Sequence, residues 1–279
     1  MSNNFFKKQE IITKLFPYMG NKLVHINLIN DLLDKSNKNI YVEPFLGSAQ
    51  VLLNLRKNYN KYYLAEIDTN LLNIFNQVFY NIDKNEFTQY AKKIINEYNP
   101  SSYEGYYTFR EYFNTILWKT NSKEECFALL ILINCCVNSM YRFGNNGFNQ
   151  GYGSRYISEY KCINFEMSLD KVKQIVNRIE LSNNAFNILN FKDSIYLLDP
   201  PYQINEMANH NNWSINDLEK MFSILDFNSN DIIYFDIENE IGNKYFKNKI
   251  ILNKIKNISP NRKEEKILNE VCYYQIKNS

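Results

Sequence analysis

The motif Asp199-Pro200-Pro201-Tyr202 combines residue types that could activate an exocyclic amine. It follows the apolar run Ile195–Leu198, and its two prolines would end a strand and fix the turn after it. An Asp side chain and a proline carbonyl can both accept hydrogen bonds from the amine, which frees the nitrogen lone pair for attack on a methyl sulfonium. The tyrosine offers a face on which a flipped base stacks, worth about 1–3 kcal/mol, against the few kcal/mol needed to extrude the base. The alternative is an ordinary turn at a strand end.

Two predicted strands upstream would bring more polar residues to the same edge of a sheet. Residues 40–42 predict a strand that leads into the small-residue turn Gly47-Ser48-Ala49, and residues 51–55 have helical spacing. A second strand over residues 62–65 ends on Glu66 and Asp68, and residues 70–78 return to helical periodicity. This order is typical of a doubly wound α/β fold, in which ligands bind at the carboxyl ends of the strands.

One long segment of the chain lacks this alternation. Residues 83–137 are amphipathic, helical in spacing and rich in tyrosine, and so predict an inserted helical subdomain. Glycines among aromatic residues between positions 143 and 156 predict a loop or hairpin. Downstream we expect helices over 167–179 and 214–225, the latter with Ser214 and Asp217 as a capping-box-like start, and strands over 195–198, 231–235 and 271–276. The expected catalytic domain comprises residues 1–75 and 163–279, and the insertion residues 76–162.

Composition narrows the class of protein. The 279 residues are 45% hydrophobic, which allows a sizeable core, and the formal charge of +2 means that any basic surface must be local. The five cysteines show no C-x-x-C spacing, so we expect idle thiols in a reducing cytoplasm and no metal site. With only two histidines, His25 and His210, a histidine general base is not expected. Met1–Glu10 is polar and the longest apolar run, Phe127–Val137, is too short for a bilayer, which predicts a soluble intracellular protein without membrane contact.

The order of motifs from about Phe16 to Tyr274 resembles the alpha class of Dam-type DNA adenine-N6 methyltransferases. The segment Phe16-Pro17-Tyr18-Met19-Gly20-Asn21-Lys22 is similar to the family's N-terminal motif. The resemblance implies that Tyr18 stacks near the cofactor, that Gly20 contributes to its site and that Lys22 reaches into that site.

Glu43-Pro44-Phe45-Leu46-Gly47-Ser48-Ala49 resembles the family's loop for S-adenosylmethionine, the implied cofactor. Small residues let the backbone approach the cofactor closely, although the family usually has more glycine where this chain has Ser48, Ala49 and Gln50. The implied cofactor-binding residues are Tyr18, Gly20, Lys22, Phe45, Gly47, Ser48, Glu66, Phe191 and Asp199. Among them, Glu66 would accept hydrogen bonds from the ribose hydroxyls, with Asp68 as a competitor, and Phe191 would contact the cofactor adenine or belong to the core.

Two further segments resemble the family's recognition elements: Tyr106–Asn114, and the hairpin formed by Asn138–Arg142, Gly147–Asn149 and Tyr152-Gly153. The resemblance implies that Asn138, Met140 and Arg142 face the DNA. Arginine is the usual bidentate partner of guanine, worth about 1–3 kcal/mol of discrimination, and Asn138 or Tyr141 would fill the space left by a flipped base. The implied DNA-binding residues are Asn138, Met140, Tyr141, Arg142, Asn149 and Arg155, with Lys161, Arg262 and Lys263 as further phosphate contacts. The alternative is a glycine-rich surface loop with a phosphate-binding arginine.

Together these expectations describe a Rossmann-like methyltransferase sheet with an inserted helical target-recognition domain and a β-hairpin. The chain would transfer a methyl group from S-adenosylmethionine to adenine N6 in double-stranded DNA, by base flipping and direct transfer, and the resemblance around Arg142 implies a GATC-like site. We expect a monomer or weak dimer on DNA in the cytoplasm, associated with the nucleoid, or in the host cytoplasm if the gene belongs to a phage. Alternatives are an amino-methyltransferase acting on cytosine or RNA, and an inactive DNA-binding subunit or regulator. The sequence leaves open whether the enzyme serves restriction–modification or acts alone.

Overall fold

The computed structural model describes residues 14–18, 20, 22–202, 213–257 and 266–277, so the predicted phosphate contacts Arg262 and Lys263 lie outside the described residues. The chain divides into two compact units. We call them the helical unit, Met1–Val24, Gly47–Leu55 and Asn73–Asn177, and the sheet unit, His25–Leu46, Arg56–Leu72 and Arg178–Ser279.

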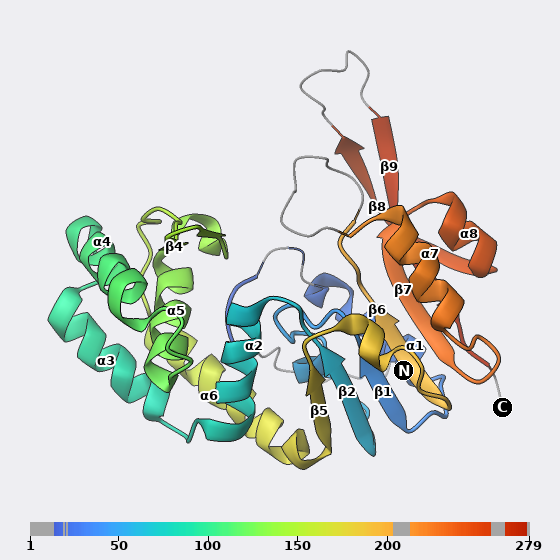
Figure 1. Ribbon diagram of the computed structural model, residues 1–279, viewed down its shortest axis with the longest axis horizontal. Coiled ribbons are helices and arrows are strands. Elements are labelled where there is room, and N and C mark those ends of the chain that lie inside the picture. The colour runs from blue at the N-terminus through green and yellow to red at the C-terminus, as the bar shows by residue number, and fades with distance from the viewer. Residues whose placement is uncertain (1–13, 19, 21, 203–212, 258–265, 278–279) are drawn as a thin grey trace, which may run out of the picture. The chain divides into compact units, whose positions relative to one another are not determined.

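The sheet unit contains a mixed, mostly parallel sheet of seven strands in the order β5-β2-β1-β6-β7-β9-β8 (Figure 1). Its first five strands in that order run parallel, whereas β9 is antiparallel to both β7 and β8. The strands are β1 (Ile40–Glu43), β2 (Lys61–Ala65), β5 (Ile179–Ser182), β6 (Ser194–Leu198), β7 (Asp231–Ile237), β8 (Asn248–Asn257) and β9 (Lys266–Gln275).

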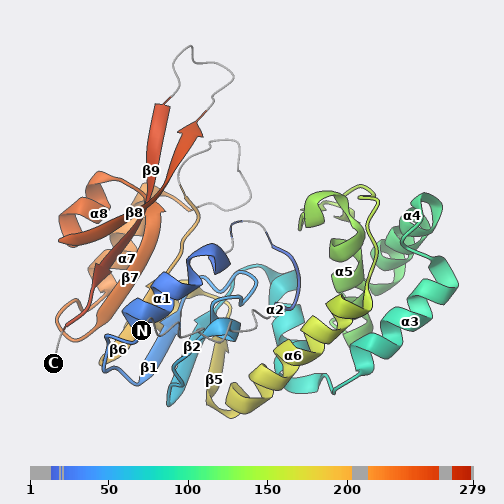
Figure 2. The same cartoon turned by 180° about the vertical axis from the view of Figure 1, so that it is seen from behind.

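Helices cover both faces of this sheet. Helix α1 (Ile26–Leu33) lies on one face, and α7 (Ile215–Ile224) and α8 (Glu240–Tyr245) lie on the other (Figures 1 and 2). Every residue of β6 and β7 is buried, as expected for central parallel strands that are covered on both sides. The predicted start of α7 is confirmed, because Ser214 and Asp217 form a capping box. These packed layers fix the strand ends that carry the candidate site.

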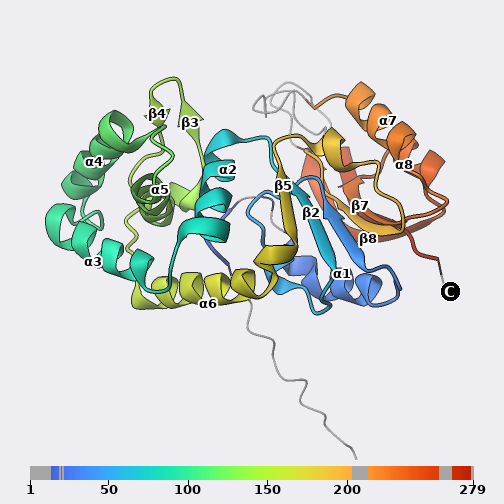
Figure 3. The same cartoon turned by 60° about the horizontal axis from the view of Figure 1, so that its bottom comes forward.

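The helical unit is built around one buried helix, α5 (Lys123–Cys135), in which every residue from Glu125 to Cys135 is buried. A short hairpin of β3 and β4 follows it (Figure 3). The other elements of the unit are α3 (Glu86–Tyr98), α4 (Tyr103–Tyr112), β3 (Phe143–Gly144), β4 (Gly147–Phe148) and α6 (Glu159–Ile175). Helix α2 (Thr69–Asn76) begins in the sheet unit and ends in the helical unit.

The structure confirms the predicted strands at 40–42, 62–65, 195–198, 231–235 and 271–276, and the hairpin after position 143. Two predicted helices are wrong in extent. Residues 51–55 form only a 3-10 turn, Leu52–Asn54, because Leu55 is extended and Arg56 N–H then donates to Asn30 Oδ1. The helix predicted over 167–179 starts earlier, at Glu159, and ends before Ile179, which pairs with Tyr62 as the first residue of β5.

Within the described part of the chain, no helix is both long and apolar enough to cross a membrane. All five cysteines are buried and free. No group of three or more histidine, cysteine, aspartate or glutamate side chains among the described residues could hold a metal ion.

Candidate active site

The Asp199-Pro200-Pro201-Tyr202 motif lies at the carboxyl end of β6, in the middle of the sheet. Strand β6 pairs in parallel with β1 on one side and with β7 on the other. Asp199 follows Leu198 directly and is partly exposed, whereas Pro200 is buried. The motif therefore stands where α/β folds of this kind bind their ligands.

A buried glutamate ends the neighbouring strand β1. Glu43 is only 4% exposed, and its Oε2 accepts a hydrogen bond from Tyr41 Oη at 3.0 Å. Burial raises the pKa of Glu43 to about 8, the hydrogen bond from Tyr41 opposes this shift, and the negative charge of Asp199 adds to it. Near neutral pH the Glu43 carboxyl group is therefore mostly protonated.

A second buried acid belongs to β7, on the other side of the motif. Asp236 accepts hydrogen bonds from Tyr234 Oη, from Ile237 N at 2.7 Å and from Asn239 Nδ2 at 2.9 Å. Burial raises the pKa of Asp236 to about 6, these hydrogen bonds lower it, and the charge of Asp199 raises it further. Asp199 thus stands between two acids whose protonation it influences, an arrangement typical of functional sites.

The fourth residue of the motif, Tyr202, is held at its hydroxyl group. Tyr202 Oη donates to Glu270 Oε1 at 3.1 Å, and Glu270 belongs to β9. Burial and the negative charges of Asp199 and Glu270 raise the pKa of Tyr202 well above its ordinary value. The hydroxyl consequently stays neutral and keeps donating.

The two acids at the end of β2 have separate structural contacts. Asp68 Oδ1 accepts from Asn70 N at 2.9 Å and Leu71 N at 3.1 Å, and so caps helix α2. Glu66 Oε1 accepts from Asp68 N at 2.9 Å, and Glu66 is partly exposed. Because capping occupies Asp68, Glu66 is the better placed of the two to meet a ligand.

Two aromatic residues expected at the cofactor pack within the sheet unit. Phe191 stacks on Tyr63 of β2, with ring centroids 3.6 Å apart and planes 17° apart. Phe45 meets Trp213 edge-on, with centroids 5.0 Å apart. Phe45 and Phe191 are partly buried and pack against the main core.

The small-residue loop after β1 has two residues with left-handed backbone conformation, of which only one is glycine. Gly47 has a φ of +55°, and Ala49, which is fully buried, has a φ of +57°. A non-glycine residue in this left-handed region costs about 1–2 kcal/mol. Gln50 Nε2 donates to Phe16 O at 3.2 Å, while its buried Oε1 has no hydrogen-bond partner among the described residues. The loop thus contains an acceptor that a bound ligand could satisfy.

The N-terminal motif lies against this loop and against the hairpin. A Cβ atom on Gly47 would lie 3.7 Å from Tyr18 Cε1, and the Tyr18 and Tyr141 rings are 5.9 Å apart. Lys22 is 7% exposed and its Nζ donates to the carbonyl of Gly20, whose φ is +73°. Tyr18 is therefore the residue through which the predicted cofactor and recognition segments of the helical unit meet.

The hairpin presents the predicted recognition residues at its base. Asn138 and Ser139 adopt φ values of +55° and +50°, and Arg155 Nη1 donates to Ser139 Oγ at 2.6 Å. Asn138 and Arg142 are exposed and Met140 is partly buried. The exposed Asn149 closes the hairpin by donating its backbone N–H to the carbonyl oxygen of Arg142 at 3.1 Å. The left-handed pair turns the chain out of α5 and leaves the Arg142 side chain facing outward.

Residues of α4 and of the turn after it form hydrogen bonds with the hairpin and the residues that follow it. Asn114 contacts both backbone groups of Phe148, accepting from its N at 2.8 Å and donating to its O at 3.0 Å. Gly147 has a φ of +106°, which strains any other residue, and a Cβ atom there would also lie 2.3 Å from Asn114 Oδ1. Tyr106 Oη and Arg110 Nη1 both donate to Gln150 O, at 2.8 and 2.9 Å. These contacts hold β4 and the residues directly after it in place.

Three acids of the site were not predicted from the sequence: Glu43, Asp236 and Glu270. Glu43 stood inside the motif that resembles the cofactor loop, and its place at a strand end was a usable signal. Asp236 lies within the apolar strand β7, and Glu270 has no local signal because strand pairing brings it to Tyr202.

Comparison with known proteins agrees with these features. The family model of the D12 class N6 adenine-specific DNA methyltransferases matches residues 18–267. A DNA adenine methylase of Haemophilus influenzae is 28% identical over 202 residues, which cover 70% of this chain and 68% of that protein. Another, from Serratia marcescens, is 34% identical over 121 residues, 43% of this chain and 41% of that protein. The type II methyltransferase M.MjaIII of Methanocaldococcus jannaschii is 26% identical over 198 residues, 67% and 68% respectively. The resemblance predicted from the motifs is confirmed, and the chain belongs to the D12 class of N6 adenine-specific DNA methyltransferases.

Proposed function

We propose that this chain takes the methyl group from S-adenosylmethionine and transfers it directly to N6 of an adenine that has been flipped out of double-stranded DNA. The catalytic residues would be Asp199, Pro200, Pro201 and Tyr202. The observation that carries the proposal is the position of this motif at the carboxyl end of β6, between the buried acids Glu43 and Asp236.

Asp199 would accept a hydrogen bond from the N6 amine, and the Pro200 carbonyl would accept another. With both N–H groups engaged, the nitrogen moves toward tetrahedral geometry and its lone pair becomes available. After methyl transfer the nitrogen would carry two hydrogens and a positive charge, and Asp199 would accept the surplus proton. Glu43, whose pKa is raised to about 8, would be mostly protonated near neutral pH and so would add little negative charge beside Asp199 before transfer.

The residues present suit S-adenosylmethionine, which when bound supplies the electrophilic methyl group. Gln50 Oε1, a buried acceptor that has no hydrogen-bond partner among the described residues, stands in the loop that also contains Ser48 and the left-handed Gly47 and Ala49. Glu66 offers a partly exposed carboxylate for ribose hydroxyls, since Asp68 is engaged in capping. The remaining proposed cofactor contacts are Tyr18, Gly20, Lys22, Phe45, Phe191 and Asp199.

The helical segment of residues 76–162 would recognise the target. Arg142 is exposed beside the hairpin, which suits a bidentate contact with guanine, and Asn138 or Tyr141 would fill the gap left by the flipped adenine. Met140 and Asn149 would lie at the same DNA surface. Arg155 and Lys161 would contact phosphates, although both already donate to protein oxygens. A GATC-like site is the specific form of this proposal.

The test is to expose unmethylated plasmid DNA to the protein and S-adenosylmethionine and to map every N6-methyladenine. We expect methylation within one short sequence context. Asp199→Ala should abolish transfer of a labelled methyl group while DNA affinity is retained. Arg142→Ala should relax the choice of one base pair, and an equal loss on all DNA sequences would instead make Arg142 a phosphate contact.

Two outcomes would contradict the proposal. Absence of methylated adenine together with undetectable cofactor binding would support an inactive DNA-binding protein. Methylated cytosine in place of adenine would assign the amine site to another base.

A further inference from the structure

The hydroxyl of Tyr202 and the side chain of an asparagine share one carboxylate. Glu270 Oε1 accepts from Tyr202 Oη at 3.1 Å, and Glu270 Oε2 accepts from Asn253 Nδ2 at 3.0 Å. Tyr202 follows β6, Glu270 lies in β9 and Asn253 in β8, so three separate segments meet at one side chain. With both oxygens engaged, the carboxylate has little freedom to rotate away from Tyr202.

An irregularity in β8 decides which side chain reaches Glu270. Ile251 pairs with Val271, whereas Asn253 pairs with Glu270, so Leu252 is an extra residue in the strand. With regular pairing, Leu252 would stand opposite Glu270, and an apolar side chain cannot donate to Oε2. Bulges of this kind often re-aim a side chain beside an active site. Here the bulge brings an amide donor to the carboxylate.

We propose that Glu270 is a positioning residue that orients the Tyr202 ring for the incoming base, and that the bulge in β8 with Asn253 holds Glu270 in place. This rests on the proposed stacking of a flipped adenine on Tyr202. A phenol ring attached only at Cβ can swing, whereas a hydrogen bond at its far end adds a second fixed point. The ring plane is then set before the base arrives, and less ordering is needed on binding.

The electrostatics of the contact agree with a lasting hydrogen bond. Burial and the charges of Asp199 and Glu270 raise the pKa of Tyr202, so its hydroxyl keeps the proton that it donates. A hydrogen bond to a charged acceptor is among the stronger ones in proteins. Removing either partner should therefore affect the ring more than removing Asn253, which acts only through Glu270.

The experiment places 2-aminopurine at the adenine that the methylation map identifies and follows its fluorescence, which rises when the base leaves the stack. Tyr202→Phe and Glu270→Ala should each reduce the fluorescence rise, and kcat with it, by about tenfold. Glu270→Gln should restore most of the signal, since an amide oxygen still accepts from Tyr202. The double variant Tyr202→Phe/Glu270→Ala should lose no more than either single variant, because both remove the same hydrogen bond.

Asn269→Ala is the matched control. It breaks a neighbouring contact of β9, from Asn269 Nδ2 to Glu238 Oε2 at 2.8 Å, and should leave the fluorescence unchanged. Cofactor affinity, measured by calorimetry, should be the same in all variants. Wild-type fluorescence and kcat in Tyr202→Phe would overturn the role of Glu270 while the proposed function stands. No fluorescence rise with the wild-type protein would overturn base flipping itself, and the role of Glu270 with it.

Discussion

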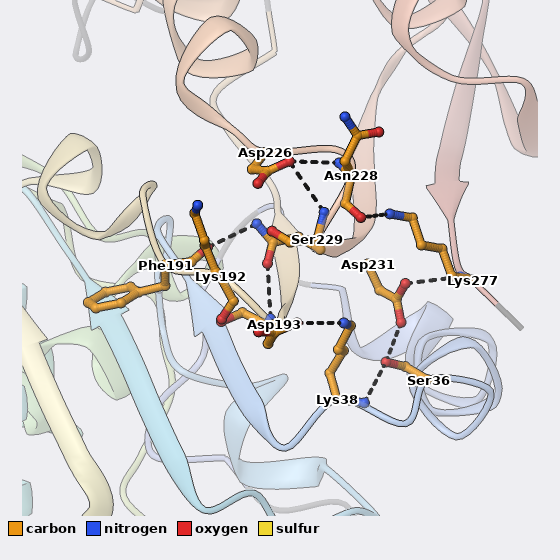
Figure 4. A network of polar contacts seen from close by, with 12 residues as sticks. Ser36, Lys38, Phe191, Lys192, Asp193, Asp226, Asn228, Ser229, Asp231 and Lys277 are labelled. Carbon is orange, nitrogen blue, oxygen red and sulfur yellow. Dashed lines mark hydrogen bonds and ion pairs between the residues drawn. The ribbon is translucent and has the colours of Figure 1, made fainter. Parts of the chain in front are cut away.

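Each end of the central sheet contains buried acidic side chains, and the partners of these side chains differ between the two ends. At the amino end, the fully buried Asp231 accepts from Ser36 Oγ at 2.6 Å and from Lys277 N at 2.9 Å (Figure 4). The preceding Asn230 binds the segment that leads into β6 at two points, accepting from Ser194 N and donating to Phe191 O. Each donor among these groups thus has an acceptor, and each acceptor has a donor.

At the carboxyl end, the ionisable groups nearest to one another are all acidic. Glu43 and Asp236 both lie within the electrostatic influence of Asp199, and burial raises the pKa of each. Their hydrogen bonds from Tyr41 and Tyr234 only partly compensate. The buried polar groups at the amino end are thus paired by hydrogen bonds, whereas the carboxyl end holds two buried acids with raised pKa values, an arrangement common at functional sites.

The largest expected effect comes from replacing the ionisable group of Glu43 by an amide in Glu43→Gln. The pKa of Glu43 is about 8 in the folded chain and near 4.5 in the unfolded chain, so the folded state holds an extra proton between these values. The free energy of unfolding of the wild-type protein therefore falls as pH rises from about 4.5 to 8, by on the order of 4 kcal/mol from this group. The amide of the variant cannot titrate, and its oxygen can still accept from Tyr41.

The measurement is urea unfolding of both proteins at pH 5, 6.5 and 8. Glu43→Gln should gain stability relative to the wild type as pH rises. Asp236, whose pKa is raised to about 6, has the same sign of effect between about pH 4 and 6 but is present in both proteins. A difference in stability that does not change with pH would show that Glu43 is ionised in the folded state.

A smaller effect is expected at the amino end. Asp231→Ala removes the acceptor of Ser36 Oγ and Lys277 N, and leaving two buried donors unpaired should cost about 2 kcal/mol at pH 7. Asp231→Asn keeps one acceptor oxygen and should cost about half as much. Unfolding curves give these values, and methyl transfer per folded molecule should match the wild type in both variants. A selective loss of transfer would mean that the two ends are coupled.

The smallest effect is expected from an ion pair at the same end whose carboxylate is exposed. Lys38 Nζ lies 3.3 Å from Asp193 Oδ1, and the Asp193 side chain is 82% exposed (Figure 4). Asp193→Asn removes the charge and suits the left-handed backbone, where φ is +52°. The free energy of unfolding should change by less than about 0.5 kcal/mol. A loss as large as that of Asp231→Ala would show that exposed charges stabilise this end as much as buried hydrogen bonds do.

The helices and strands that could be predicted are those whose structure is determined by their local sequence. The strands at 195–198 and 231–235 are continuous apolar runs, and the helix after Ser214 has its capping residues in the local sequence. Strands β5 and β8 were missed because they lie at the sheet edges, are partly polar and depend on pairing with β2 and β9. Local pattern and pairing thus account for different parts of the same sheet.

The candidate site divides in a similar way. Asp199-Pro200-Pro201-Tyr202 could be found because residue type and order carry its chemistry. The raised pKa values of Glu43 and Asp236 arise from burial and from the nearby Asp199, which belongs to another strand. The contact between Asn253 and Glu270 depends on one extra residue in β8, and no local pattern marks that position.

The left-handed alanine in the loop after β1 has a consequence for how such chains are recognised. Ala49 adopts a left-handed backbone conformation that glycine usually provides, so the loop makes this turn without a glycine at that position. A single nucleotide change interconverts alanine and glycine codons, and relatives can therefore drift between the two residues. A profile that scores this loop by its glycines alone would rank such chains too low, whereas one that tolerates alanine at position 49 would keep them with their relatives.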